Sequence, residues 1–316
     1  MPHRFLEMLA GSRRRPAIVA HRGDSFHAPE NTLEAARMAY EAGAEAWEFD
    51  VQLTRDGVPI LLHDSSLRRT TDVASRFASD PRAGIDFPVG EFDLEEIRQL
   101  DAGSWFVDPR GGPRSAAWFG TLGALEPRLA GRFASGTVRI PTLSEALTLT
   151  VELDWLANVE IKSFPDRPPG LLEAVLQTIA ATGSAGQVLV SSFDHRELAR
   201  VTLLEQGGGR SPELPRGALL GTPLRRPETY VRDILGADTL HLSADCLGAS
   251  SMSYRRQPSP AALDGEVVAA SARNGIPVLV YTVNDSGPGA LAGHLHAIGV
   301  AGLFTDNPGG LRRSLE

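Results

Sequence analysis

Eight short, nearly continuous apolar runs recur along the 316-residue chain, and helix-like stretches separate many of them. The runs span residues 18–20, 47–51, 158–162, 188–193, 218–220, 240–243, 278–283 and 303–305. Strands that are apolar on both faces and alternate with helices are typical of a buried parallel sheet. Eight strand–helix units in a chain of this length suit a (β/α)8 TIM barrel, and we predict this α/β fold.

Amphipathic stretches between these runs predict the helices that a barrel needs. Asn31-Thr32 can cap a helix that starts at residue 33, and Gly43 follows its end. Further helices are expected at residues 142–149, 171–182, 196–205, 228–235, 262–274 and 288–298. A doubly wound open sheet is the alternative fold. No Gly-x-Gly-x-x-Gly follows the first run, which weakens a dinucleotide-binding version of that alternative.

Residues 50–64 do not fit the strand–helix repeat, because they form two extended arms around Asp56-Gly57. Asp-Gly favours a two-residue hairpin turn, in which both positions need positive φ. With these two residues as the turn, Asp50 lies opposite His63, and cross-strand Cβ atoms are about 4.5–5.5 Å apart. We therefore expect the hairpin to return His63 to the face of the strand that carries Asp50.

Residues 65–136 are irregular and rich in Gly, Pro, Arg and aromatic residues, with one amphipathic piece near residues 94–100. A segment of this length is too long for a plain loop. We predict an insertion that covers one end of the barrel, within a single catalytic domain that spans residues 1–316.

Composition narrows the class of protein. The formal net charge of −8 argues against a nucleic-acid-binding surface, which normally has a basic excess. Cys246 is the only cysteine, so no disulfide can form within the chain. Because no apolar segment is long enough for a secretory signal or a transmembrane helix, we expect a cytoplasmic protein. The oligomeric state stays open, a homo-oligomer included.

Polar residues collect where the predicted strands end, and this end of a barrel carries the active site. Glu48 and Asp50 stand two positions apart on the second strand and share a face, as do Glu160 and Lys162 on the third. Buried carboxylates need a nearby cation, because an unpaired buried charge is costly. A structural salt bridge is one solution. The three carboxylates also suit a hard divalent cation, Mg²⁺ or Ca²⁺, as cofactor.

Two histidines stand near this cluster, His21 at the end of the first strand and His63 after the hairpin. Each alone resembles an ordinary core or loop histidine. As a pair beside carboxylates they are candidates for acid–base catalysis, because imidazole titrates near neutral pH. Arg22 and Lys162 would complement a phosphodiester anion. Lys162 is the only lysine among 31 basic residues, either by chance or because a compact ammonium is needed. Among the other histidines, His195 after the fourth strand is the next candidate.

Short motifs follow one another in order along nearly the whole chain. They are His21-Arg22-Gly23, Pro29-Glu30-Asn31-Thr32, Glu48-x-Asp50, Asp56-Gly57 through His63-Asp64, Leu67-x-Arg69-Thr70-Thr71, Ile140-Pro141-Thr142-Leu143-x-Glu145-Ala146, Glu160-Ile161-Lys162, Ser192-Phe193 and Gly302-Leu303-Phe304-Thr305-Asp306-x-Pro308. Any one tripeptide is a weak signal, but the ordered series resembles the glycerophosphodiester phosphodiesterase family.

This resemblance implies roles for individual residues. His21 and His63 match the family's acid–base pair. The matches to its metal ligands are Glu48, Asp50 and Glu160. Its phosphate-binding cations correspond to Arg22 and Lys162. Glu30 matches an acid near the metal and the substrate, and Tyr281 stands where the family usually carries Trp, which alters the wall of the substrate pocket.

The reaction expected from the resemblance is hydrolysis of a small glycerophosphodiester to sn-glycerol 3-phosphate and an alcohol such as choline, ethanolamine or glycerol. Water or the substrate's own glycerol hydroxyl could be the nucleophile. One alternative is a phospholipase D-like enzyme that acts on lysophospholipids through an apolar groove formed by residues 65–136. Others are a barrel that only binds phosphodiesters and an aldolase-type enzyme with Lys162 as a Schiff base, against which Glu160 and Arg22 argue.

Overall fold

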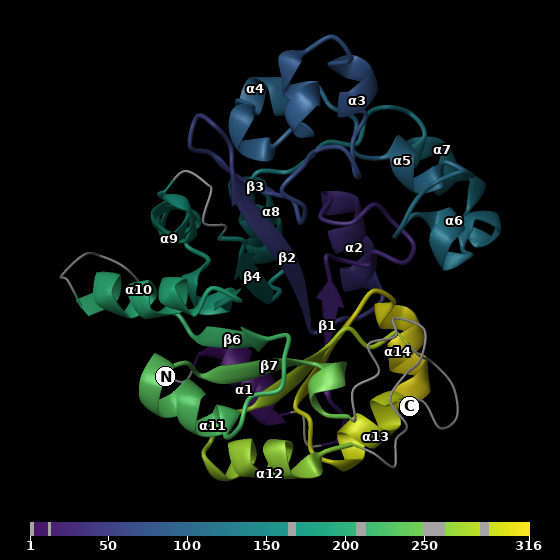
Figure 1. Cartoon of the computed structure of the whole chain (residues 1–316). Coiled ribbons are helices and arrows are strands. Elements are labelled where there is room, and N and C mark those ends of the chain that lie inside the picture. The colour runs from purple at the N-terminus through teal and green to yellow at the C-terminus, as the bar shows by residue number, and fades with distance from the viewer. Residues whose placement is uncertain (1–2, 12–13, 164–168, 207–212, 249–262, 285–290) are drawn as a thin grey trace.

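Eight parallel strands close on themselves into a barrel. The computed structural model describes residues 3–11, 14–163, 169–206, 213–248, 263–284 and 291–316. The barrel strands are β1 (Ala17–His21), β2 (Ala46–Leu53), β4 (Ala157–Ile161), β5 (Val188–Ser192), β6 (Arg216–Leu220), β7 (Thr239–Ser243), β8 (Val278–Tyr281) and β9 (Gly302–Thr305). Each pairs in parallel with the next, and β9 pairs with β1, which closes the sheet (Figure 1). The predicted (β/α)8 fold is confirmed, and the open sheet is excluded.

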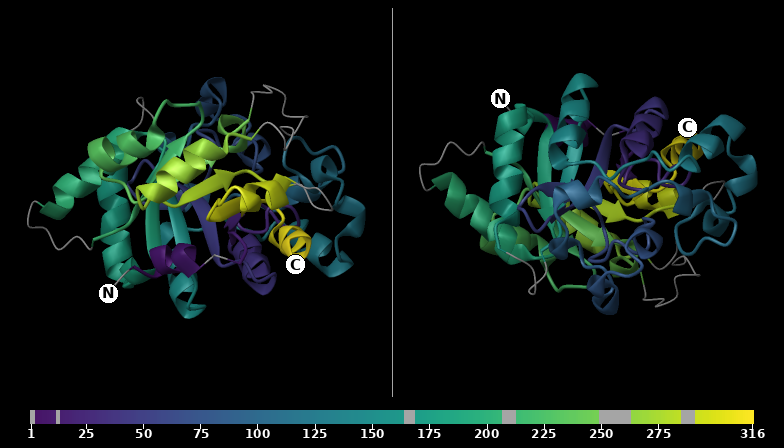
Figure 2. Two further views of the ribbon diagram at one scale, coloured as in Figure 1. Left: turned by 90° about the horizontal axis from the view of Figure 1, so that it is seen from below. Right: turned by 90° about the horizontal axis from the view of Figure 1, so that it is seen from above.

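Helices surround these strands in all three views (Figures 1 and 2). They are α2 (Leu33–Glu41), α8 (Leu143–Glu152), α9 (Leu171–Thr182), α10 (His195–Gln206), α11 (Pro227–Thr229) with its π-helical continuation η5 (Tyr230–Leu235), α12 (Gly265–Arg273), α13 (Leu291–Ala297) and α14 (Pro308–Leu315). Single 3₁₀ turns are η4 (Ala185–Gln187) and η6 (Ala244–Cys246).

The predicted helices are present, with bounds that differ by a few residues. As expected, Thr32 caps α2, because its hydroxyl accepts a hydrogen bond from the amide of Ala35. Residues 262 and 288–290, where two predicted helices begin, lie outside the described residues. Within the described part of the chain, no helix is long and apolar enough to cross a membrane.

The amino-terminal end of the barrel is closed by α1 (Arg4–Gly11), a helix that the sequence analysis did not predict. Its Phe5 and Leu9 are buried against apolar side chains of the barrel interior, among them Val19 and Leu279. The His3 imidazole also bonds to the carbonyl of Ala185 in η4, the turn that precedes β5. This apolar floor leaves the carboxyl ends of the strands as the open end.

The antiparallel strand β3 (Pro59–Leu61) forms the expected hairpin with β2, but the predicted register is wrong. Val51 pairs with Leu61, one residue off the predicted alignment, so His63 does not face Asp50. The turn has three residues instead of two: Thr54 bonds to Val58, and only Gly57, at φ +81°, has positive φ. A type I turn followed by a left-handed glycine gives this longer hairpin loop.

Residues 65–136, which we call the insertion, fold into short helical segments at the top and the upper right of Figure 1. These are α3 (Val73–Arg76), η1 (Pro81–Ile85), η2 (Val89–Glu91), α4 (Leu94–Ile97), α5 (Ser104–Val107), α6 (Ala116–Phe119), η3 (Leu122–Ala124) and α7 (Pro127–Phe133). Its buried aromatic side chains pack with Ile60 and Leu62 of the hairpin and with Ala35 of α2. The insertion therefore shares a core with the carboxyl-terminal side of the barrel.

A histidine is also buried in the interior of the barrel. His241 of β7 is fully buried, with Nε2 bonded to Thr239 and its ring 5.2 Å from that of Phe304. The neighbouring strand makes room with Gly217, where an added Cβ would lie 2.5 Å from the imidazole. Burial lowers the pKa of His241 to about 3.

This burial predicts a pH-dependent loss of stability. Above pH 6.5 His241 is neutral in both the folded and the unfolded chain and contributes nothing. As the pH falls towards 3, only the unfolded chain takes up the proton, which lowers the free energy of unfolding by about 1.4 kcal/mol per pH unit. Urea unfolding measures the free energy of unfolding of wild type and of His241→Gln. We expect the difference between these two free energies to change with this slope between pH 6 and pH 4. A flat difference would contradict the prediction.

Candidate active site

The carboxyl ends of the strands surround a cavity of about 240 Å³. Its wall consists of His21, Arg22, Glu48, His63, Arg114, Asn158, Glu160, Lys162, Phe193, Leu219, Tyr281, Thr282 and Phe304. Seven of the nine residues that the sequence analysis singled out are among them. The other two, Glu30 and Asp50, are buried and form ion pairs with Arg22 in the wall. The structure therefore brings all nine to one place.

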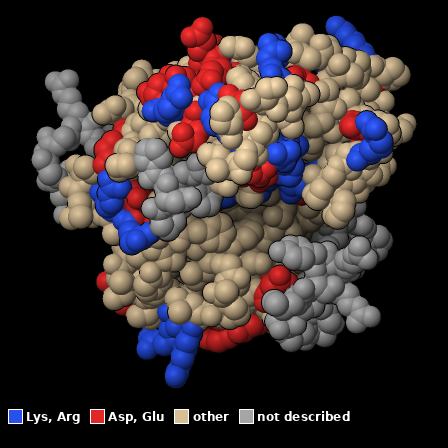
Figure 3. Space-filling model, turned by 45° about the horizontal axis from the view of Figure 1, so that its top comes forward, with Lys and Arg blue, Asp and Glu red and all other residues tan. Residues whose placement is uncertain are grey.

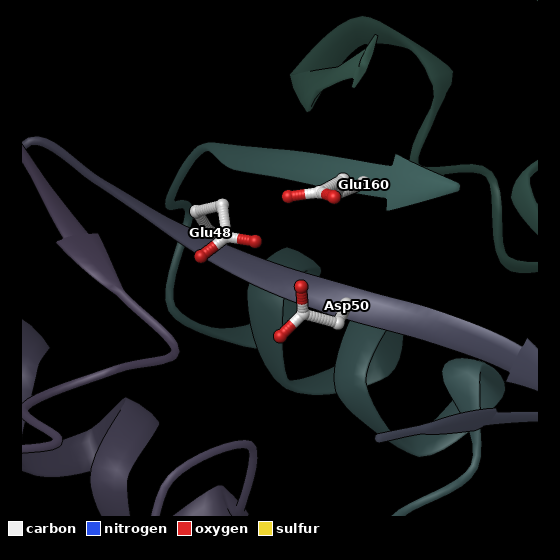
Figure 4. Close-up of side chains that lie close together, drawn as sticks. All are labelled: Glu48, Asp50 and Glu160. Carbon is white, nitrogen blue, oxygen red and sulfur yellow. The ribbon is translucent and has the colours of Figure 1, made fainter. Parts of the chain in front are cut away.

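Three carboxylates form the centre of this site. Glu48 and Asp50 of β2 and Glu160 of β4 point toward one another, and one oxygen of each lies within 4.8 Å of the others (Figure 4). The register of the two strands causes this, because Asp50 pairs directly with Glu160. All three side chains are at least nine-tenths buried.

Two cations contact the carboxylates. Lys162 Nζ lies 2.9 Å from Asp50 Oδ1 and 2.5 Å from Glu160 Oε1. Arg22 Nε lies 3.1 Å from Asp50 Oδ2, and the backbone amide of Arg22 donates to Glu48 Oε2. Burial acts to raise the pKa of Asp50, but the charges of Lys162 and Arg22 outweigh it and lower that pKa.

The other two carboxyl groups behave in the opposite way. Burial and the negative charges of Asp50 and Glu160 raise the pKa of Glu48 well above its usual range. Burial also raises the pKa of Glu160, although Lys162 acts against it. Glu48 Oε1 is buried without a hydrogen bond, whereas Asp50 Oδ1 and Glu160 Oε1 have the Lys162 ammonium as their polar contact.

The charge balance of the surroundings explains these shifts. Six carboxylates meet four Lys or Arg cations in the connected ion pairs of this site. The carboxylates are Glu30, Glu48, Asp50, Asp64, Glu160 and Asp306, and the cations are Arg22, Arg69, Arg114 and Lys162. The excess is two negative charges, and two of the carboxyl groups, Glu48 and Glu160, have raised pKa values. Three buried carboxylates that converge within 4.8 Å and an excess of two negative charges fit a hard divalent cation.

His21 is held by a carboxylate. Its Nδ1 lies 2.7 Å from Asp306 Oδ1, and its Nε2 lies 4.0 Å from Glu48 in the cavity wall. Because the carboxylate of Asp306 selects the tautomer with a proton on Nδ1, Nε2 is the basic nitrogen. Burial and the positive charge of Arg22 lower the pKa of His21 to about 4. The imidazole is therefore neutral at neutral pH.

His63, like His21, is held by an aspartate at its Nδ1. Its Nδ1 lies 2.7 Å from Asp64 Oδ1, and Asp64 in turn pairs with Arg69. Although the hairpin register differs from the prediction, His63 still lines the cavity, because β3 ends at Leu61 and the chain turns there. Buried Gln52 holds this turn by donating its amide to the carbonyls of residues 62, 63 and 64.

The opposite wall of the cavity is apolar. Tyr281 packs edge-to-face on Phe193 with ring centroids 5.9 Å apart, and its hydroxyl donates to the carbonyl of Leu220. Burial raises the pKa of Tyr281, so the phenol stays neutral. His195 is not part of the site: its Nδ1 bonds to the hydroxyl of Tyr230, and its Nε2 to the carbonyl of Leu219.

Sequence reasoning gave no role in the site to five polar residues that support it: Asn31, Asp64, Arg69, Arg114 and Asp306. Asp306 and Arg69 stand in motifs noted above, but their partners lie far away in the sequence. Asn31 donates to Asp50. Arg114 comes from the insertion and reaches both Glu30 and Asp306. No motif surrounds Arg114, so the sequence alone carried no signal for it.

Comparison with known proteins adds the family. The sequence model of the glycerophosphoryl diester phosphodiesterase family matches residues 21–310. This chain belongs to that family. A glycerophosphodiester phosphodiesterase of Caldanaerobacter subterraneus subsp. tengcongensis is 31% identical over 291 residues, which cover 92% of this chain and 94% of that protein. The fold and the activity class of this chain follow: it is an enzyme, a phosphoric diester hydrolase.

Solved structures in the family share the whole architecture. A crystal structure from Silicibacter pomeroyi has a TM-score of 0.73 and 25% identity, and the match covers 99% of this chain and 97% of that one. An Oleispira antarctica phosphodiesterase in complex with the product sn-glycerol-3-phosphate has a TM-score of 0.68 and 25% identity, over 95% and 97% of the two chains.

The hydrogen bonds of Gln52 give a stability prediction. Gln52→Met keeps the length of the side chain but removes the amide donor from three carbonyls, so we expect a loss of about 1–3 kcal/mol in the free energy of unfolding. Urea unfolding measures it. The control Gln99→Met changes an exposed glutamine of the insertion and should cost less than about 0.5 kcal/mol. Equal effects of the two substitutions would contradict this role of Gln52.

Proposed function

We propose that this hydrolase cleaves glycerophosphodiesters with small head groups to sn-glycerol 3-phosphate and an alcohol. The observation that supports this most directly is the pair of histidines in one cavity, each with Nδ1 bonded to an aspartate and Nε2 left for chemistry. The relative from Oleispira antarctica, in complex with sn-glycerol-3-phosphate, supports the product. We assign the reaction to one domain that spans residues 1–316, because the insertion and the barrel share a core and a cavity.

In this proposal His21 and His63 share the proton transfers. One Nε2 takes the proton of the nucleophile, and the other ring, which enters the step as an imidazolium protonated on both nitrogens, gives its Nε2 proton to the leaving alkoxide. The aspartates fix the two rings, since a carboxylate on Nδ1 sets the tautomer and the orientation of an imidazole. Arg22 and Lys162 lie in the cavity wall and provide positive charge for the phosphodiester anion.

We further propose that Glu48, Asp50 and Glu160 hold a divalent cation, Mg²⁺ or Ca²⁺. Their convergence within 4.8 Å, the buried Glu48 Oε1 without a hydrogen bond and the excess of two negative charges support this assignment. When bound, such a cation would withdraw charge from a non-bridging phosphate oxygen and lower the pKa of a coordinated hydroxyl. Glu30 acts indirectly, because it pairs with Arg22 and holds that arginine beside the cluster.

The size and polarity of the cavity favour a small substrate over a lysophospholipid. Its volume of about 240 Å³ is below the roughly 300–1,000 Å³ that is usual for drug-sized ligands. Among the described residues of the insertion, the one that lines the cavity is the charged Arg114.

On the face that Figure 3 shows, basic and acidic side chains are interspersed over the upper part. Such a mixture fits a small-molecule site better than a nucleic-acid surface.

A Schiff-base mechanism at Lys162 does not fit the surroundings of its amine. Burial acts to lower the pKa of Lys162, but Asp50 and Glu160 outweigh it and raise that pKa. The amine therefore stays protonated, whereas a nucleophilic lysine needs a lowered pKa.

The first test is release of sn-glycerol 3-phosphate from glycerophosphocholine and glycerophosphoethanolamine, with Mg²⁺, with Ca²⁺ and with EDTA. We expect release that depends on the metal and stops in EDTA. A lysophospholipid with a long acyl chain serves as the competing substrate. Faster turnover of the lysophospholipid would favour the phospholipase D-like alternative, and no turnover of any substrate by folded protein would favour a binding-only barrel.

Separate replacement of the two histidines tests their roles. His21→Ala and His63→Ala should each lower kcat by roughly 10²–10⁴, because each removes one proton transfer. The control His294→Ala changes a histidine of α13, outside the cavity wall, and should leave kcat within about twofold of wild type. A kcat near that of wild type in either cavity variant would remove that histidine from the proposed mechanism.

A further inference from the structure

Arg114 is the place where the insertion enters the cavity. Its Nε lies 2.7 Å from Glu30 Oε2, and its Nη2 lies 2.6 Å from Asp306 Oδ1 and 3.1 Å from Ser25 Oγ. The side chain is 21% exposed and lines the cavity. The guanidinium thus joins two carboxylates that belong to different parts of the barrel.

These two carboxylates lie on a continuous chain of ion pairs between the candidate catalytic histidines. The chain runs His21–Asp306–Arg114–Glu30–Arg69–Asp64–His63, and each step is between 2.5 and 2.8 Å. It begins at Nδ1 of one histidine and ends at Nδ1 of the other. Arg114 is the third of its seven members and joins the His21–Asp306 end to Glu30, so the two imidazoles are connected through its guanidinium.

The backbone of Arg114 indicates that these contacts have a function. Its φ is +71°, in the left-handed region that is uncommon for a residue with a side chain. Such a conformation persists when the surroundings hold it, and it concentrates at functional sites. Here Glu30 and Asp306 hold the guanidinium, and a glycine at the same position would meet no steric penalty.

Direct binding of the substrate phosphate is the competing explanation, but the partners of Arg114 argue against it. Arg22 and Lys162 pair with Asp50, a member of the carboxylate cluster, so a cation bound there would compete for their partner. The partners of Arg114 lie outside that cluster and stay available to it. Arg114 therefore keeps its contacts whether or not the cluster holds a cation.

We propose that Arg114 is a positioning residue: by bridging Asp306 and Glu30 it aligns His21 and His63, so that the insertion completes the catalytic site. This inference rests on the proposed function of the two histidines. It gives the insertion a role in catalysis in addition to covering the barrel.

Arg114→Gly is the most informative substitution. Glycine adopts the observed φ freely, Asp306 keeps Asn284 and Ser25 as partners, and Glu30 keeps Arg22 and Arg69, so the fold should persist. We expect kcat for glycerophosphocholine to fall by about 10- to 100-fold, as is usual when a partner that orients functional groups is lost. KM should stay within about threefold, because the substrate contacts remain. Arg114→Lys keeps the positive charge but loses the planar guanidinium that bonds to two carboxylates at once. Its kcat should lie between those of wild type and Arg114→Gly.

A matched control comes from the same segment. Arg82 pairs with Asp80 and Glu96 within the insertion, away from the cavity. Arg82→Gln should lower Tm and leave kcat of the folded enzyme unchanged. An Arg114→Gly enzyme with kcat within twofold of wild type would overturn the proposal. A raised KM with unchanged kcat would also overturn it, and would show that Arg114 contacts the substrate.

A second readout does not depend on turnover. ¹⁵N NMR of histidine-labelled protein in EDTA, assigned with the His21→Ala and His63→Ala variants, reports the tautomer and hydrogen bonding of each ring. In Arg114→Gly the signals of His21 and His63 should both move, while those of His195 and His241 stay in place. If wild type hydrolyses no glycerophosphodiester, the proposed function fails, and this measurement still decides the positioning role. Unchanged signals for both cavity histidines would refute it.

Discussion

Uncompensated negative charge at the open end of the barrel is the constraint on which the rest of the site depends. β2 and β4 place three carboxylates on facing positions where burial makes free charge costly. The four cations that balance it come from three segments: Arg22 from the end of β1, Arg69 and Arg114 from the insertion, and Lys162 from the end of β4. Charge balance therefore ties distant parts of the chain to one another.

The six carboxylates divide into two groups by what surrounds them. Asp64 and Asp306 each bond to a histidine. These two aspartates and Glu30 also pair with arginines, so protein side chains neutralise all three carboxylates. In the cluster, Asp50 and Glu160 share the Lys162 ammonium, and Glu48 keeps a buried oxygen without a hydrogen bond. The first group orients catalytic rings, and the second has capacity to bind a cation. Both tasks need acidic residues. The side chains that contact each carboxylate decide which of the two tasks it performs.

Local patterns allowed most of the barrel to be predicted. Every strand was found because a parallel strand in a barrel is apolar on both faces, and Thr32 was found because a helix start leaves amides that a hydroxyl can cap. The predicted hairpin register was wrong, because a glycine in the left-handed conformation, here Gly57, fits a three-residue turn as well as a two-residue turn. The helix α1 and the role of Arg114 depend on tertiary contacts with residues far away in sequence, which no local pattern records.

The single lysine of the chain gains a physical explanation from its position. Every other Lys or Arg position is arginine, so the use of lysine at 162 is specific to that place. Its Nζ contacts one oxygen of Asp50 and one of Glu160, which belong to different carboxylates on different strands. A guanidinium spreads its charge over a plane and suits both oxygens of one carboxylate, whereas an ammonium is a point charge that two carboxylates can share. The geometry of the cluster, and not the number of positive charges, accounts for lysine here.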